Sequence, residues 1–352
     1  PGFFDDPYQQ YDRIRAGERA HHSPLGIVLL HRYADCFDLL RLPGTSVEDR
    51  NARATWRTPP PPEAAERGRR AILNLDPPDH TRLRRLVSTA FTARTVARLE
   101  PWISDLADRI VARAARRTSV DGVTDLADPL PVNVIAELVG IPEADRAQFR
   151  AWSAAIVSAS PEGPVATLEF AAYIDRLAAR RRTDPKDDLV SELVALERTG
   201  DALDRDELVA MIQLLLIAGQ ETAVDLIVNG VRLLLAHPAQ WHAVRDDPTL
   251  ASAAVEETLR YRGSVEVVPP RFTFQDVELA GGAIPPYERI ALSLWGANRD
   301  PAVFERPDEF DIFRPDVRHH LAFGHGHHFC LGASLGRLEG RIMLERIATQ
   351  LP

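Results

Sequence analysis

The sequence Phe323-Gly324-His325-Gly326-His327-His328-Phe329-Cys330-Leu331-Gly332 is the most informative part of this chain. It holds one of only two cysteines, so Cys330 has to be explained as a thiol rather than as part of a disulfide framework. The three glycines let the backbone turn sharply and approach a flat ligand closely. Beyond the loop, apolar residues recur with helical spacing from Leu335 to Ile347. Cys330 is therefore expected at the N-terminus of a helix, where free N–H groups favour a thiolate, and a thiolate suits a soft metal.

Four explanations compete for Cys330: a buried structural cysteine, a zinc ligand, a nucleophile with a histidine base, or an axial ligand of haem iron. Zinc is suggested by the histidines that crowd the loop, which are His319, His320, His325, His327 and His328. Structural zinc normally needs four ligands, often with a Cys-x-x-Cys pair, and Cys36 is far away in the sequence. A nucleophilic cysteine would call for an Asp or Asn nearby, and the loop contains neither.

The loop matches the pattern Phe-x-x-Gly-x-x-x-Cys-x-Gly at every position and resembles the haem-binding loop of the cytochrome P450 superfamily. The resemblance implies haem b, with Cys330 as the axial ligand and Phe323 and Gly332 in contact with the cofactor. It also implies a mainly α fold with a minor β part, described as a triangular helical prism around a buried haem. We expect residues 1–352 to form a single catalytic domain.

A long amphipathic pattern over residues 204–236 contains Ala218-Gly219-Gln220-Glu221-Thr222. Gly219 costs about 1 kcal/mol against alanine in a helix, and a buried Glu221 would need a partner or a change of protonation. A kink satisfied by a side chain or a water explains these residues structurally. They also match the family's Ala-Gly-x-(Glu/Asp)-Thr motif, although Ala223 replaces a hydroxyl residue that often follows. The resemblance implies a dioxygen groove beside Ala218 and Gly219, with Thr222 and Glu221 relaying protons.

Two further sets of residues occur in the order that the family uses. Glu257 and Arg260 lie three apart on a predicted helix and can pair; with Arg314, they are implied to form a charge triad that braces the cysteine loop. Haem carries two propionates that need cationic donors. The resemblance implies that these donors are His80, Arg84, Arg271 and His328.

The predicted elements are mostly helical. Helices are expected over residues 33–42, 78–93, 96–117, 131–139, 143–158, 165–182, 186–198, 204–236, 238–245 and 249–261, besides the one after the cysteine loop. Strands are expected over residues 23–32, 270–279 and 289–294. The proline-rich and charged segment 51–72 is predicted to be a long loop. Relative to the family, the sequence stops at Pro352 before an expected β-hairpin, and the joint near residues 158–168 looks short.

Composition narrows the class of protein. The net charge of −9 argues against general nucleic-acid binding. No run approaches eighteen apolar residues and no charged-then-apolar leader opens the chain, so we expect neither a membrane span nor a signal peptide, and a cytoplasmic protein. Lys186 is the only lysine while arginine is abundant, a bias that indicates a bacterial genome rich in G and C. We also expect a monomer. Pro1 is not a natural start, which indicates a processed or trimmed N-terminus.

The resemblance implies a monooxygenase that inserts one atom of dioxygen into a C–H or C=C bond of a small apolar or amphipathic substrate, in bacterial secondary metabolism. Electrons from NAD(P)H are expected through a separate ferredoxin reductase and ferredoxin. Candidate substrate-lining segments are residues 51–73, 212–218 and 264–268, where Glu266 is expected to meet a polar group. Arg82, Arg85, Arg337 and Arg341 are either a docking patch for an acidic ferredoxin or ordinary solvated arginines. The alternatives are peroxide use, oxidative coupling, or a non-catalytic haem or zinc protein.

Overall fold

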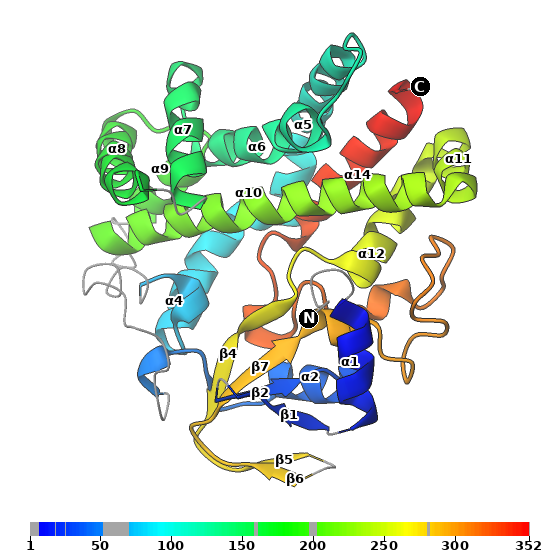
Figure 1. The fold of residues 1–352 in the computed structure, drawn as a ribbon. Helices are drawn as coiled ribbons and strands as arrows, with labels where there is room; N and C mark the ends of the chain where they lie inside the picture. The colour runs from blue at the N-terminus through cyan, green and yellow to red at the C-terminus, as the bar shows by residue number, and fades with distance from the viewer. Residues whose placement is uncertain are drawn as a thin grey trace.

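The structure, a computed structural model, describes residues 7–17, 19–24, 26–51, 70–157, 161–196, 203–279 and 282–351. Helices dominate, and Figure 1 shows them gathered above a small sheet that packs with α1 and α2. The helices are α1 Pro7–Ala16, α2 Tyr33–Arg41, α4 Asp79–Val87, α5 Ala93–Ala114, α6 Pro129–Val139, α7 Arg146–Val157, α8 Gly163–Thr183, α9 Leu189–Ala195, α10 Arg205–Ala236, α11 Pro238–Asp246, α12 Ala251–Arg262, α13 Leu294–Asn298 and α14 Ala333–Gln350. The mainly α class predicted from the sequence is confirmed.

Where helix ends differ from the prediction, local hydrogen bonding explains the difference. The pattern over residues 78–93 continues past α4 only as a short 3₁₀ turn over Ser88–Phe91. The helix predicted over residues 186–198 begins later, because the Asp188 side chain caps α9 by accepting the Ser191 N–H at 2.8 Å.

The strands join the two ends of the chain. They are β1 Ala20–His22, β2 Ile27–Leu30, β3 Thr45–Ser46, β4 Val267–Thr273, β5 Val277–Leu279, β6 Gly282–Ile284 and β7 Arg289–Ser293. The main sheet has the order β1-β2-β7-β4-β3, and β2 pairs in parallel with β7. The strand expected over residues 23–32 is present but shorter, as β2, because a turn closed by the Gly26 N–H on the Ser23 carbonyl precedes it; β1 lies before the expected range. The piece expected over residues 270–279 divides into the end of β4 and β5.

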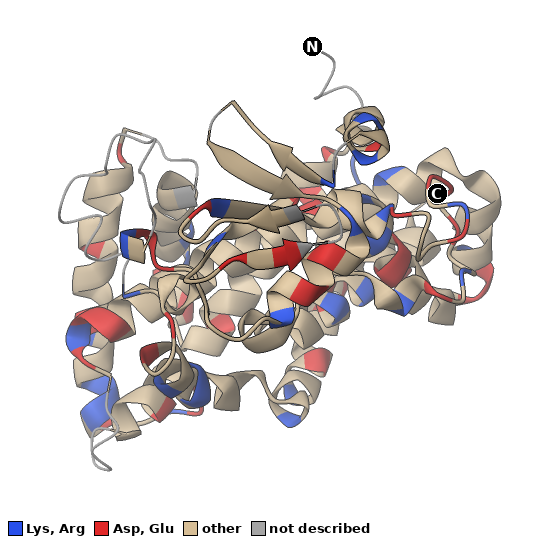
Figure 2. Cartoon of the chain, turned by 90° about the horizontal axis from the view of Figure 1, so that it is seen from below, with Lys and Arg blue, Asp and Glu red and all other residues tan. Residues whose placement is uncertain are grey.

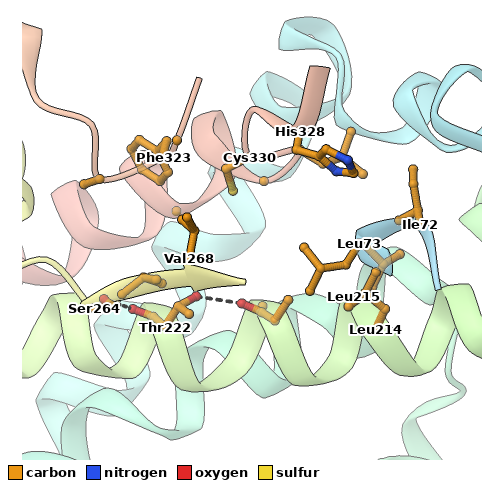
Figure 3. Close-up of a pocket in the computed structure, with 18 of the residues that line it drawn as sticks. Ile72, Leu73, Leu214, Leu215, Thr222, Ser264, Val268, Phe323, His328 and Cys330 are labelled. Carbon is orange, nitrogen blue, oxygen red and sulfur yellow. Dashed lines mark hydrogen bonds between the residues drawn. The ribbon is translucent and has the colours of Figure 1, made fainter. Parts of the chain in front are cut away.

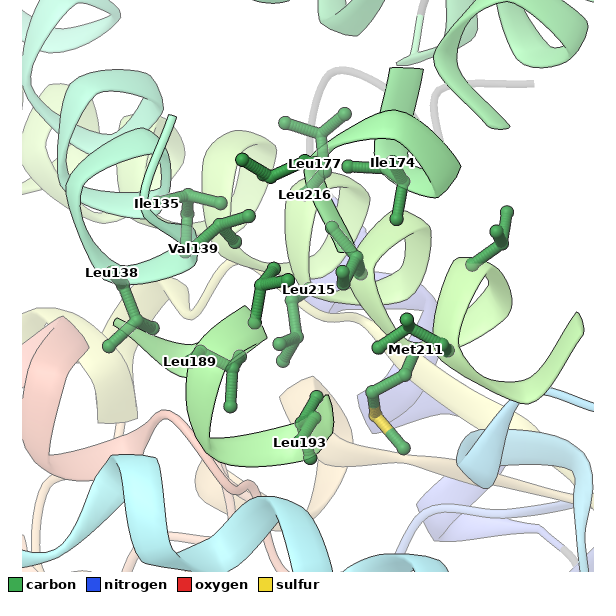
Figure 4. Packing of buried hydrophobic residues seen from close by; sticks show 14 of the residues in the cluster. Ile135, Leu138, Val139, Ile174, Leu177, Leu189, Leu193, Met211, Leu215 and Leu216 are labelled. Carbon is green, nitrogen blue, oxygen red and sulfur yellow. The ribbon is translucent and has the colours of Figure 1, made fainter. Parts of the chain in front are cut away.

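Helix α10 has 32 residues and runs through the centre of the helical part (Figure 1). Asp204 and Glu207 form the predicted capping box at its start. Among the described helices, only α10 is long and apolar enough to cross a membrane, judged by length and composition alone. Its apolar residues serve the core instead: Met211, Leu215 and Leu216 pack with side chains of α6, α8 and α9 (Figure 4).

Close helix crossings fix α14, and hence the cysteine loop that precedes it. A Cβ on Gly340 would come within 3.0 Å of Leu226 on α10 and 3.1 Å of Val255 on α12. A Cβ on Gly230 would come within 2.9 Å of Leu344. Glycine at these two positions lets α14 approach α10 and α12 closely.

Candidate active site

A cavity of about 470 Å³ lies between α10 and the segment formed by the cysteine loop and α14 (Figure 3). Its walls are mostly apolar. Ten of the eleven predicted site residues line it together: His80, Arg84, Ala218, Gly219, Thr222, Arg271, Phe323, His328, Cys330 and Gly332. The exception is Glu221. Four separate stretches of the chain thus bring predicted residues to one site.

The Cys330 loop has a tight, defined shape. The Cys330 N–H donates to the Phe323 carbonyl at 2.9 Å, which closes the loop. Gly324 and Gly326 have φ angles of 67° and 73°, in the left-handed region that favours glycine. A Cβ on Gly326 would meet the Leu40 carbonyl oxygen of α2 at 2.3 Å, so only glycine fits there. The loop is therefore held against α2 and presents the thiol to the cavity (Figure 3).

The expected thiolate is not stabilised by the helix terminus alone. Burial raises the pKa of the Cys330 thiol, and this outweighs the Gly332 N–H and the charges of Arg84 and Arg337, which lower it. Helix α14 begins only at Ala333, so Cys330 lies outside its first turn. A metal ion bound at the sulfur would supply a further positive charge that favours the thiolate.

One face of α14 leaves room for a flat ligand. A Cβ added to Gly332 or to Gly336 would meet nothing within 4 Å, and both residues line the cavity. Sequence reasoning missed Gly336, although its position four residues after Gly332 places the two on one helix face. The same face carries Glu339, whose carboxyl is buried and whose Oε2 has no hydrogen-bond partner.

The four predicted cationic donors converge at the cavity. Both ring nitrogens of His80, Nε2 of His328, and Nε and Nη1 of Arg271 are buried without a hydrogen-bond partner. Burial lowers the pKa of His80 to about 4, of His328 to about 2 and of Arg271 to about 10. Arg84 instead donates to the Phe329 carbonyl at 2.6 Å. Donors without acceptors are costly inside a protein, so this group fits an anionic ligand.

The Ala218–Thr222 segment borders the cavity on α10. The Thr222 hydroxyl donates to the Ala218 carbonyl at 2.6 Å, one turn back. Gly219 has a packing role that the sequence did not indicate, because a Cβ there would lie 2.7 Å from Ile135 of α6. Glu221 was expected to be buried, and this is wrong: it is exposed and does not line the cavity.

The buried polar residue of this segment is Gln220, which points to the other side of α10. Its Nε2 donates to Asp128 at 2.9 Å, and its Oε1 accepts the hydroxyl of Ser153. The helical period explains why Gln220 is buried and Glu221 is exposed, since successive residues lie about 100° apart round the helix.

The predicted charge triad is present. Arg260 binds Glu257 through two hydrogen bonds of 2.7 and 2.8 Å, and Arg314 Nε lies 3.5 Å from the same carboxylate. All three side chains are buried. Arg260 also donates to the carbonyls of Asn298, Pro307 and Glu309, so the triad fixes the segment that leads to the cysteine loop.

A second brace, missed from the sequence, reaches the cysteine loop itself. Glu256 accepts from Arg337 Nε at 2.6 Å and lies 3.0 Å from His320 Nε2. Burial alone would raise the pKa of Glu256, but the hydrogen bonds with His320 and Arg337 lower it to about 2. The Arg337 guanidinium also lies 4.4 Å from the ring centre of Phe323. The adjacent acids Glu256 and Glu257 thus hold different segments.

The proposed docking patch of arginines is largely neutralised by the chain's own acids. Arg82 pairs with Glu207, Arg337 with Glu256, and Arg341 with Glu100. Figure 2 shows basic and acidic segments interspersed along the molecule. These three pairs argue against a docking patch and favour the alternative, ordinary solvated arginines, although these three are paired with acids.

The predicted substrate-lining segments are partly correct. Val265 and Val268 line the cavity, together with Leu214 and Leu215 of α10 and with Ile72 and Leu73 (Figure 3). Residues 52–69 of the expected loop lie outside the described residues. Glu266 is not available to a ligand in the cavity, because its carboxylate accepts the hydroxyl of Tyr11 and does not line the cavity.

These residues fit haem better than zinc. Within the described ranges, no group of three His, Cys, Asp or Glu side chains could hold a metal ion. A single thiol, unpartnered cationic donors, two glycines with open space and apolar walls suit a flat, anionic, metal-bearing ligand.

Comparisons with known proteins agree with this geometry. The family model described as Cytochrome P450 matches residues 169–349. The chain is 42% identical to the vitamin D(3) 25-hydroxylase of Pseudonocardia autotrophica, over 99% of the chain and 87% of that relative. It is also 42% identical to the cytochrome P450 monooxygenase PikC of Streptomyces venezuelae, over 99% and 85%.

Solved structures are equally similar. The cytochrome P450 PksS of Bacillus subtilis matches with a TM-score of 0.88 at 36% identity, covering 99% of this chain and 89% of that one. P450BioI, solved in complex with an acyl carrier protein that carries hexadec-9Z-enoic acid, matches with a TM-score of 0.87 at 34% identity, covering 99% and 92%.

Proposed function

This chain belongs to the cytochrome P450 family and is a monooxygenase, and we propose that it oxidises a C–H bond of an apolar or amphipathic molecule, with haem held by Cys330. One observation carries the proposal. A single cavity unites the Cys330 thiol, the unpartnered donors of His80, Arg271 and His328, and the Thr222 end of α10. The chain would act as one catalytic unit over residues 1–352.

The cavity residues divide the work of holding the cofactor. Cys330 would be the axial ligand, and the three unpartnered donors, with Arg84, would bind the propionates. Gly332 and Gly336 leave space for the ring, and Phe323 borders it. When bound, haem supplies the dioxygen chemistry, and a thiolate ligand favours O–O cleavage.

Residues of α10 would control protons. The Thr222 Oγ proton is held on the Ala218 carbonyl, and rotation of the hydroxyl would direct it into the cavity. Glu221, exposed beside Thr222, would take protons from solvent. The apolar wall of Leu214, Val265 and Val268 would exclude other water and orient the substrate.

The substrate class follows from the cavity wall and from the relatives. Apolar side chains dominate the cavity, which suits a hydrocarbon body. One relative is named a vitamin D(3) 25-hydroxylase, and two similar structures contain myristic acid and a carrier-bound hexadecenoic acid. We therefore propose a lipid-like or polyketide-like secondary metabolite. Titrating such compounds and recording the shift of the haem spectrum from low to high spin tests this class.

Electrons would come from NAD(P)H through a separate ferredoxin reductase and ferredoxin, with the chain acting as a monomer in the bacterial cytoplasm. The deciding experiment compares turnover with NAD(P)H and redox partners against turnover with hydrogen peroxide alone. Product formed only with peroxide would favour the alternative of a peroxide-using enzyme. A purified, reduced protein that lacks the thiolate-type carbon monoxide spectrum would contradict the proposal as a whole.

A further inference from the structure

Ser264 connects the cavity wall to the catalytic segment of α10. It lies two residues after α12 and lines the same cavity as Thr222. Its hydroxyl donates to the Thr222 carbonyl at 2.6 Å, while the Thr222 hydroxyl donates to the Ala218 carbonyl at 2.6 Å. Figure 3 shows the two hydrogen bonds in line along the helix. Two carbonyls one turn apart therefore each accept a side-chain hydroxyl.

The two hydrogen bonds differ in origin. A carbonyl oxygen inside a helix has a second lone pair, so it can accept a hydroxyl besides its own N–H. Thr222 bonds back within its helix, which is common and slightly bends a helix. Ser264 comes from another part of the chain, so its hydrogen bond fixes the position of Thr222 relative to the cavity wall.

The segment around Ser264 is itself anchored on both sides. The carbonyl of Gly263 accepts the Trp295 indole N–H at 2.7 Å. The carbonyl of Arg262 accepts from Asn229 of α10 at 3.2 Å. Immediately after Ser264, Val265 enters the cavity wall. Ser264 is therefore a fixed point between the substrate-facing wall and α10.

We propose that Ser264 is a positioning residue that holds Thr222 in register with the cavity wall, so that the Thr222 hydroxyl delivers its proton to the reacting end of the cavity. Ser264 does not itself transfer a proton. The inference rests on the proposed role of Thr222. It adds that proton delivery depends on a hydroxyl outside α10.

Four variants of the haem-loaded protein test the inference: Ser264→Ala, Ser264→Thr, Thr222→Ala and Ser153→Ala. Ser153 is the matched control, because its hydroxyl also binds α10, at the Gln220 side chain away from the cavity. The readouts are product and hydrogen peroxide formed per NAD(P)H, with myristic acid and vitamin D3 as probes. Amide hydrogen exchange of residues 218–226 without a probe is the readout independent of turnover.

Loss of one neutral hydrogen bond corresponds to about a fivefold change in a population. We expect Ser264→Ala to lower the ratio of product to peroxide about fivefold and to speed exchange in this segment. Ser264→Thr keeps a hydroxyl donor, so its ratio of product to peroxide and its amide exchange should both stay close to those of the wild type. Ser153→Ala should leave the ratio unchanged. If neither probe is turned over, the exchange comparison decides.

Three results would overturn this inference while leaving the proposed role of Thr222 intact. The first is a wild-type ratio of product to peroxide and wild-type amide exchange in Ser264→Ala while Thr222→Ala is uncoupled. The others are a Ser264→Thr variant that behaves like Ser264→Ala, or a Ser153→Ala variant that lowers the ratio as much as Ser264→Ala does. If Thr222→Ala stays fully coupled, the proposed role of Thr222 fails, and the inference fails with it.

Discussion

The imidazole rings of His80 and His328 lie 4.2 Å apart, centre to centre, although they come from α4 and from the cysteine loop. Burial lowers the pKa of both, and His327, Arg84 and Arg271 lower it further; His80 also lowers the pKa of His328. The surroundings therefore disfavour a positive charge on either ring, and an anion placed beside them would favour it. The arrangement would suit a ligand that carries negative charge, such as the propionates of haem.

Replacing Cys330 with alanine should abolish the thiolate-type spectrum of the reduced protein with carbon monoxide, because no other cysteine lines the cavity. Cys36→Ala is the control. Because Cys36 is buried in the core, this substitution should lower the stability of the protein while leaving the spectrum intact. Retention of the spectrum in Cys330→Ala would contradict the ligand assignment.

Replacing Arg271 with leucine should have opposite effects on the two forms of the protein. Without haem, removal of a buried cation with unpartnered Nε and Nη1 should raise the free energy of unfolding by about 1–3 kcal/mol. With haem, loss of a charged donor should weaken retention of the cofactor about tenfold or more. Thermal unfolding of both forms and haem transfer to a scavenger protein measure the effects. Arg205→Leu, a change to an exposed arginine on α10, should leave haem retention unchanged.

Replacing Thr222 with alanine should preserve haem binding and divert electrons from product to peroxide roughly tenfold, because the hydroxyl on the Ala218 carbonyl is lost. Thr258→Ala is matched to it, since Thr258 donates to the Ala254 carbonyl in the same way within α12 and outside the cavity lining. Full coupling in Thr222→Ala would argue against any role in proton delivery.

Glu339 should make stability depend on pH in one direction. Burial raises its pKa to about 8, above the ordinary value near 4.3 in an unfolded chain. The fold therefore favours the protonated form, and the free energy of unfolding should fall as the pH rises from about 4 to about 8.

Glu339→Gln removes this titration. The haem-free protein is unfolded in urea at several pH values. At pH 4 the free energies of unfolding of the variant and the wild type should differ little; between pH 5 and pH 8 the free energy of the variant should rise relative to that of the wild type by about a few kcal/mol. Glu345→Gln, on the same helix but outside the cavity lining, should follow the wild-type slope. Parallel pH profiles for Glu339→Gln and the wild type would show that Glu339 ionises freely.

Most of the helices were predictable because they depend on local patterns. The capping box at Asp204 and the apolar period behind it define α10 without any tertiary information. The turn between β1 and β2 was missed because one hydrogen bond at Gly26 decides it. Motif residues such as Cys330, Arg271 and Thr222 were found because their types and order are unusual, and the structure brings them to one cavity.

Roles that depend on which way a side chain points were less predictable. Glu221 and Gln220 are neighbours in the sequence, and the sequence does not say which of them the core covers; packing of α7 and the segment before α6 against α10 buries Gln220. The sequence did not single out Glu256, and it indicated Ser264 only as part of the substrate-lining segment 264–268, because their partners are distant in the chain.

The cysteine loop shows which properties follow from the sequence and which depend on the tertiary structure. The sequence by itself determined the ligand type, the family and the mainly helical class, since these follow from residue identity and local periodicity. Only the tertiary structure decided which acids reach the site, where the unpartnered donors converge and how far the thiol is buried. The physical reason is that burial and pairing are properties of the surroundings, which long-range packing assembles.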